Sequence, residues 1–129
     1  MTINHVSLGV SDLDKSAAFY DAVLGELGYT RQHEVEGITL AYGEQWPEVW
    51  ITLPLDTEHP ASGGNGTHIA FTAESPAAVD AFHRVAMAMG AQDDGTPGLR
   101  PDYGPTYYGA FVLDLDGNKI EACYFEVGA

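Results

Sequence analysis

Three side chains of this sequence, His5, His68 and Glu121, have the chemistry of a divalent-metal site. Two imidazoles and one carboxylate that leave coordination positions open form a ligand set for Fe(II) or Mn(II), and also one set used by catalytic zinc. An ion held in this way can polarise a substrate through its open positions. The sequence therefore predicts a metal-dependent site, provided that the fold brings the three side chains together.

The two histidines occupy equivalent places in an internal repeat. His68 follows His5 by 63 residues, and the glycines expected to end the first and second helices, Gly28 and Gly90, are 62 residues apart. Landmarks with different structural roles recur here at nearly the same spacing. This agreement indicates that the chain contains two modules of similar design.

Each half begins with an alternating strand, at 4–10 or 67–72, followed by an amphipathic helix that Ser11 or Ser75 is expected to cap. We expect the remaining strands at 30–36, 38–42, 48–53, 91–93, 107–114 and 119–125, with a loop at 95–105. The pattern predicts an α+β domain spanning residues 1–129. It is built from two βαβββ modules, at about 1–55 and 67–129, joined by the linker 56–66.

Strand alternation assigns side chains to the two faces of each sheet. Because amphipathic helices lie on apolar surface, the face that carries Ile69 and Ile120 should be the one covered by helices. His5, His68 and Glu121 then share the opposite, concave face. This arrangement favours one site built from both modules.

The repeat also indicates whether a fourth ligand exists. When the last strands of the two modules are aligned, Trp50 falls opposite Glu121. An indole nitrogen only donates hydrogen bonds and cannot bind a metal. The sequence therefore supports three protein ligands and not four.

Other side chains on the concave face and in the 95–105 loop are candidates for catalysis and substrate binding, because aromatic walls with a few polar groups are typical of small-molecule sites. Arg100 is the best placed to meet an anionic substrate. We expect catalytic roles for Glu121, Tyr107 and Tyr108. We expect substrate contacts from Ser7, Trp50, Thr52, Arg100, Tyr103 and Cys123.

The composition limits the partners. The chain of 129 residues has 5 Lys and Arg against 19 Asp and Glu, a formal charge of −14, so it is too poor in cations to bind nucleic acid or an anionic membrane. No apolar run approaches the roughly 20 residues that span a bilayer. The N-terminal sequence lacks a secretory signal, and the lone Cys123 suits a reducing compartment. We expect a cytoplasmic protein that binds a small molecule.

Three segments carry a resemblance to a known family: HVSLGVSDLDKSAAFYDAVLGELGY, GTHIAF and YYGAFVLDLDGNKIEACYF. With the repeat, they resemble the vicinal oxygen chelate superfamily, also called the glyoxalase, bleomycin-resistance and extradiol-dioxygenase group. The resemblance implies a cup-shaped mixed sheet with helices on its convex face and a divalent metal inside. It also implies that His5, His68 and Glu121 bind Fe, Mn, Ni or Zn, and that the protein is a homodimer.

The resemblance leaves two functions open. The first is a metal-dependent lyase or dioxygenase that chelates a small organic substrate through vicinal oxygens. Trp50 departs from true glyoxalase I, whose pattern has a second Glu there, and the few basic residues disfavour a phosphonate-binding thiol transferase. The alternative is a metal-free protein that sequesters a small aromatic drug, as bleomycin-resistance relatives do. Whether the modules pair within one chain or across two also stays open.

Overall fold

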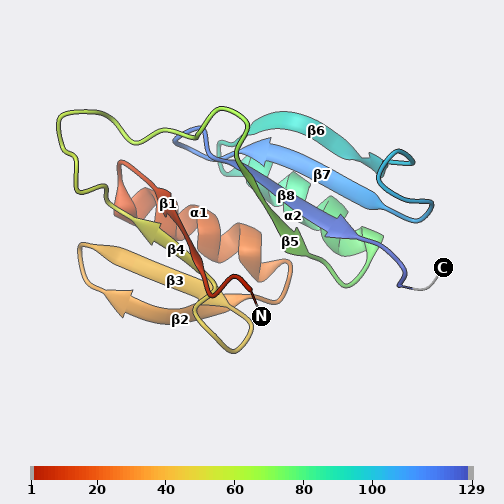
Figure 1. The fold of residues 1–129 in the computed structure, drawn as a ribbon, viewed down its shortest axis with the longest axis horizontal. Helices are drawn as coiled ribbons and strands as arrows, with labels where there is room; N and C mark the ends of the chain where they lie inside the picture. The colour runs from red at the N-terminus through yellow and green to blue at the C-terminus, as the bar shows by residue number, and fades with distance from the viewer. Residues whose placement is uncertain (1, 128–129) are drawn as a thin grey trace.

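The computed structural model describes residues 2–127, in which each half of the chain forms its own four-stranded mixed sheet (Figure 1). The first half contains β1 (Val6–Gly9), α1 (Leu13–Gly25), β2 (Thr30–Val35), β3 (Thr39–Gly43) and β4 (Val49–Thr52). The second half contains β5 (His68–Thr72), α2 (Pro76–Ala88), β6 (Gln92–Leu99), β7 (Tyr108–Leu113) and β8 (Lys119–Tyr124).

The two sheets have the same strand order, β1-β4-β3-β2 and β5-β8-β7-β6, and in each the first and last strands are parallel. The predicted α+β fold with two βαβββ modules is confirmed. Within residues 2–127 the sheets remain separate, because β1 and β5 form the facing edges without a hydrogen-bonded ladder between them (Figure 1). The modules meet instead through contact between α1 and α2.

The first helix starts and ends at different residues from those expected. Its N-cap is Asp12, whose side chain accepts from the Lys15 backbone N–H, and Ser11 instead donates its backbone N–H to Asp116. The helix ends at Gly25, and Gly28 follows with a φ of +85°. In contrast, Ser75 caps α2 as predicted, with Pro76 in the first turn.

The strand β6 is longer than predicted. It runs on through 95–99, where we expected a loop, and its pairing with β7 extends from Gln92 to Leu99 with two interruptions. Its register shifts on both sides of Gly95. Bulges of this kind at a sheet edge accommodate the glycines and Pro97, which a regular strand would disfavour. The glycines and Pro97, which we interpreted as a loop, therefore belong to an irregular edge strand.

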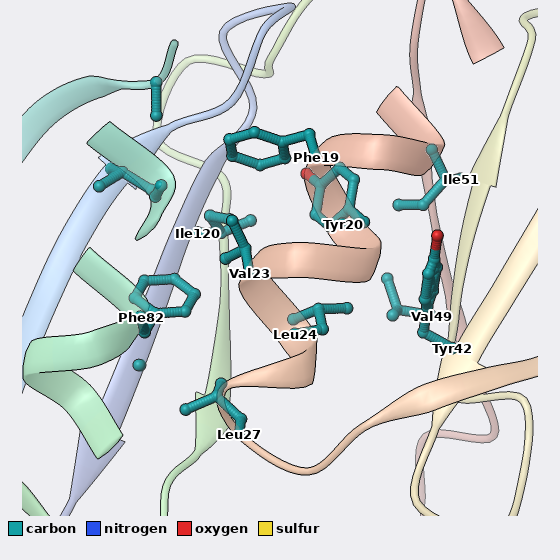
Figure 2. Packing of buried hydrophobic residues seen from close by; sticks show 14 of the residues in the cluster. Phe19, Tyr20, Val23, Leu24, Leu27, Tyr42, Val49, Ile51, Phe82 and Ile120 are labelled. Carbon is teal, nitrogen blue, oxygen red and sulfur yellow. The ribbon is translucent and has the colours of Figure 1, made fainter. Parts of the chain in front are cut away.

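The core is continuous across both modules, with α1 at its centre (Figure 2). One side of this helix packs on the first sheet and the other side faces α2 and β8. The fully buried side chains that meet here include Phe19, Tyr20, Val23, Leu24, Tyr42, Ile51, Val79, Phe82 and Ile120. Each helix has 13 residues, and no helix in residues 2–127 has the length and apolar character needed to cross a membrane.

A buried carboxylate also joins the modules. Asp114, which is 6% exposed, accepts from Tyr20 Oη at 2.5 Å, from the backbone N–H groups of Asp116 and Asn118, and from Asn118 Nδ2. Asn118 Nδ2 also donates to the Gly9 carbonyl at 2.9 Å. The turn between β7 and β8 is thus tied to both α1 and β1.

Candidate functional site

Glu121 is the centre of the candidate site. Its side chain is only 3% exposed, with Oε1 3.1 Å from His68 Nε2 and Oε2 accepting from Tyr107 Oη at 2.5 Å. The register of the second sheet places Ala70 beside Glu121. This small side chain leaves room for His68, two residues earlier on the same face of β5, to reach the carboxylate. The predicted pair of His68 and Glu121 is therefore together in the single chain.

The hydrogen bond from Tyr107 is supported by its neighbours. The Tyr107 ring stacks on Phe125 with centroids 5.7 Å apart, and Tyr103 meets it edge-on at 5.3 Å. A Cβ at Gly109 would lie 3.1 Å from Glu121 Oε2, so the glycine makes room for the carboxylate. Burial, and then the bond to Glu121, raise the pKa of Tyr107 far above its usual value. The phenol therefore acts as a donor.

These side chains border an open hollow of about 520 Å³, a size typical of small-molecule sites. Sequence reasoning had singled out five of its lining residues: His68, Arg100, Tyr103, Tyr107 and Glu121. It missed the other four, Asp94, Gly95, Phe111 and Lys119. Alternation could have identified Lys119, because it precedes Glu121 by two positions on the same strand.

His5 lies apart from this group. Its exposed ring donates from Nδ1 to Asn4 Oδ1 at 2.6 Å and meets Trp50 edge-on at 6.2 Å. Among residues 2–127, no three His, Cys, Asp or Glu side chains are close enough to hold one ion. His5 and His68 do border a common groove between β1 and β5. The single chain thus assembles two of the three predicted ligands.

The other predicted residues of the first module form a separate group on their own sheet. Trp50 pairs with Ser7 across β1 and β4, and His33 meets the Trp50 ring at 5.6 Å. Ser7 Oγ donates to Thr52 Oγ1 at 3.4 Å. None of these residues lines the hollow beside Glu121. Because the two sheets are separate, each one presents only part of the predicted site.

Tyr108 and Cys123 lie outside the hollow. Tyr108 Oη donates to Asp80 of α2 at 2.6 Å, so this side chain is on the helix-covered face. Adjacent strand residues point to opposite faces, which is why Tyr107 and Tyr108 do not share one site. Cys123 is 8% exposed, and burial raises the pKa of its thiol. Its position is that of a packed, unreactive thiol.

The contact between His68 Nε2 and Glu121 Oε1 has the length of a hydrogen bond, and this length is also compatible with two ligands of one metal ion. Two donors that bind one ion at about 2.1 Å and at right angles are about 3 Å apart. The separation of 3.1 Å between His68 Nε2 and Glu121 Oε1 matches this value. Two protein ligands alone do not make a firm site, so a metal ion at this place would need a further ligand from outside this group.

Comparisons with known proteins cover nearly the whole chain. The family model described as Glyoxalase/Bleomycin resistance protein/Dioxygenase superfamily matches residues 2–122. Lactoylglutathione lyase from Haemophilus influenzae is 34% identical over 128 residues, with 94% of this chain and 90% of that protein covered. Metallothiol transferase FosB from Shouchella clausii is 29% identical over 119 residues, with 92% and 77% covered. A glyoxalase/bleomycin resistance protein from Albidiferax ferrireducens superposes with a TM-score of 0.85 at 36% identity, covering 98% of this chain and 100% of that one.

Proposed function

From the fact that this chain belongs to the Glyoxalase/Bleomycin resistance protein/Dioxygenase superfamily, we propose that it is a divalent-metal-dependent enzyme acting on a small organic substrate through vicinal oxygens. One observation carries the proposal. The buried carboxylate of Glu121 is held by Tyr107 on one oxygen and has its other oxygen beside His68, at the edge of a hollow of about 520 Å³.

In this proposal His68, Glu121 and His5 hold the ion, for which Fe, Mn, Ni and Zn are the candidates. When bound, the ion would polarise the substrate oxygens as a Lewis acid. Tyr107 orients Glu121 by occupying Oε2, which leaves Oε1 directed toward His68. The His5 Nδ1 bond to Asn4 leaves Nε2 free as a ligand atom. The rings of Tyr103 and Phe111 would enclose the organic part of the substrate.

We further propose that a second copy of the chain supplies His5. His5 is exposed beside the half-buried Trp50 on the first sheet, and the hollow beside Glu121 is open on the second sheet. Each sheet thus presents ligands that the other sheet lacks. Two identical chains related by a two-fold axis would complete two such sites at once. This arrangement gives the predicted homodimer a role in the chemistry.

We do not expect true lactoylglutathione lyase activity, although a relative of that name is 34% identical. Trp50 occupies the position of a fourth ligand and cannot bind a metal. Assays with the hemithioacetal of methylglyoxal and glutathione should therefore give no turnover with Fe, Mn, Ni or Zn. Turnover would show that the protein is a lactoylglutathione lyase, and it would not contradict the proposed metal ligands.

Metal content tests the proposal directly. Protein purified without chelator should carry near-stoichiometric metal, and His68→Ala and Glu121→Gln should lose it. His83→Ala is the matched control, because His83 lies on α2 and contacts Asp93 instead of Glu121. A folded wild-type protein that is metal-free and cannot be reloaded with Fe, Mn, Ni or Zn would exclude the enzyme.

The competing function is metal-free sequestration of an aromatic compound. The rings of Tyr103, Tyr107 and Phe111 around one hollow favour it. This function requires tight binding by metal-free protein and the same affinity in His68→Ala. Under either function the partner is a small molecule, and the single Cys123 keeps the cytoplasm as the expected location.

A further inference from the structure

The hollow beside Glu121 contains one guanidinium that no carboxylate of residues 2–127 pairs with, and from it we propose that the substrate carries a single carboxylate bound by Arg100. The organic part of this carboxylate would lie against Phe111 and Tyr107. The inference rests on the proposed function for the site's location. It adds the chemical class of the substrate, an apolar or aromatic monocarboxylate.

The distribution of charge makes Arg100 unusual. The chain has 5 Lys and Arg against 19 Asp and Glu, yet Arg100 and Lys119 both line this hollow. Lys119 Nζ is paired with Asp94 at 3.0 Å, and Arg31 elsewhere is held by two carboxylates. Arg100 donates only to backbone carbonyls, those of Thr96 at 2.7 Å and Leu99 at 3.5 Å. Its positive charge is therefore left for a ligand.

The position of the guanidinium is built into β6. Its Cζ lies 5.6 Å from the centroid of the Phe111 ring. A Cβ at Gly95 would come within 3.3 Å of Arg100 Nη2, and one at Gly98 within 3.2 Å of Nη1. The two glycines thus leave the space in which the guanidinium lies against the strand. This is a defined place for a cation and differs from a surface arginine in solvent.

The unpaired guanidinium of Arg100 indicates the charge and shape of the ligand. A guanidinium has five N–H donors in a planar fork that matches a carboxylate, and the carbonyls of Thr96 and Leu99 use only some of them. Lys119 pairs with Asp94, and the Glu121 carboxylate contacts His68 and Tyr107. Arg100 is therefore the one cation lining the hollow, among residues 2–127, that no carboxylate pairs with, and a single carboxylate matches it better than a dianion does. A cationic ligand would meet Arg100 and Lys119, which already lie near the Phe111 ring.

Benzoate is the probe, titrated calorimetrically into the full-length protein, with benzyl alcohol, benzylammonium and phenylphosphonate as matched ligands. Benzoate should bind most tightly. Arg100→Gln should weaken benzoate at least tenfold and leave benzyl alcohol unchanged. Arg100→Lys should restore part of the loss, since it keeps the charge and loses the fork. Arg84→Gln is the control, because it removes the same charge from the exposed surface of α2.

Gly98→Ala provides a second test that leaves the charge unchanged. Its methyl group should displace the guanidinium and weaken benzoate by less than Arg100→Gln does. Equal benzoate affinity in wild type and a folded Arg100→Gln protein would overturn the inference. So would tighter binding of benzylammonium or phenylphosphonate than of benzoate.

Metal analysis of the same samples separates this inference from the proposed function. Arg100→Gln should keep the wild-type metal content. Benzoate binding that depends on Arg100 in a protein unable to hold metal would support the inference and exclude the enzyme. Stoichiometric metal together with equal benzoate affinity in wild type and Arg100→Gln would support the proposed function and overturn the inference about Arg100.

Discussion

Tyr107 Oη donates a hydrogen bond of 2.5 Å to Glu121 Oε2, and the other oxygen of that carboxylate lies 3.1 Å from His68 Nε2. The two oxygens of one buried carboxylate thus have different partners. A tyrosine from the loop before β7 sets the orientation of a side chain in β8. In the proposed metal site, a single chain would thus bring together and orient two of the three ligands.

Tyr107→Phe should weaken metal binding by about 10- to 100-fold, because partners that orient a ligand carry that share of the affinity. The substitution keeps the ring that stacks on Phe125 and removes only the hydroxyl. Competition with a chelator of known affinity measures the change, and the thermal midpoint checks the fold. Tyr103→Phe is the control, since it alters a neighbouring ring of the same hollow. If Tyr107→Phe bound metal with wild-type affinity, Tyr107 would have no role in positioning Glu121 for the ion.

Mixed dimers should show whether the site crosses between subunits. As homodimers, the His5→Ala protein and the Glu121→Gln protein should each bind no metal. If His5 of one subunit joins Glu121 of the other, unfolding and refolding an equal mixture restores one intact site in each mixed dimer, about a quarter of all sites at random pairing. Metal analysis of the refolded mixture gives the answer. No restored metal in a confirmed mixed dimer would place the three ligands within one chain.

Asp114→Asn should lower the free energy of unfolding by about 3 kcal/mol. All hydrogen-bond partners of the Asp114 carboxylate donate to it, so an amide would turn its own N–H₂ group toward donors in a buried place. Urea denaturation measures the loss. Asp116→Asn is the matched control: Asp116 accepts one backbone bond from Ser11 at a half-exposed position, and we expect a loss below about 1 kcal/mol. Equal losses of unfolding free energy in the two variants would show that the buried Asp114 carboxylate contributes no more than the half-exposed Asp116.

The protein should lose stability above about pH 10, where tyrosines of the unfolded chain ionise. Burial raises the pKa of Tyr20, with a further contribution from Asp114, and burial also raises the pKa of Tyr42. Because the folded pKa values are higher, this stabilisation is present below pH 10 and is lost as the pH rises through them. Denaturation midpoints between pH 8 and about 11 test this. Tyr20→Phe should show a shallower decline than wild type, and Tyr103→Phe, which removes an exposed hydroxyl, should not.

Much of the fold and part of the site could be predicted from local pattern. The alternation of polar and apolar residues placed His68 and Glu121 on one face, and the repeat indicated two modules of equal design. The first inference concerns neighbours within one sheet, where the pleat sets which side chains share a face. The second depends only on spacings along the chain. The same rule, applied to Tyr107 and Tyr108, would have shown that one of them faces α2.

Two details of the predicted fold failed for different reasons. The β6 strand contains glycines and a proline that are typical of loops, and only its pairing with β7 makes it a strand. At the start of α1 the choice was local: Asp12 is as good a capping residue as Ser11, and its side chain accepts from the Lys15 N–H. A long-range contact overrides local preference only at β6.

By itself the sequence determined the two modules, the succession of helices and strands along each of them, and the side chains that share a face of one strand, because these depend on periodicity within short segments. Only the tertiary structure decided that the sheets stay separate, that His5 lies beside Trp50 and away from Glu121, and that Arg100 rests on Phe111 without a carboxylate. The physical reason is that docking of one module on another follows from the packing of α1 against α2 and β8. No periodic pattern along the chain encodes that packing.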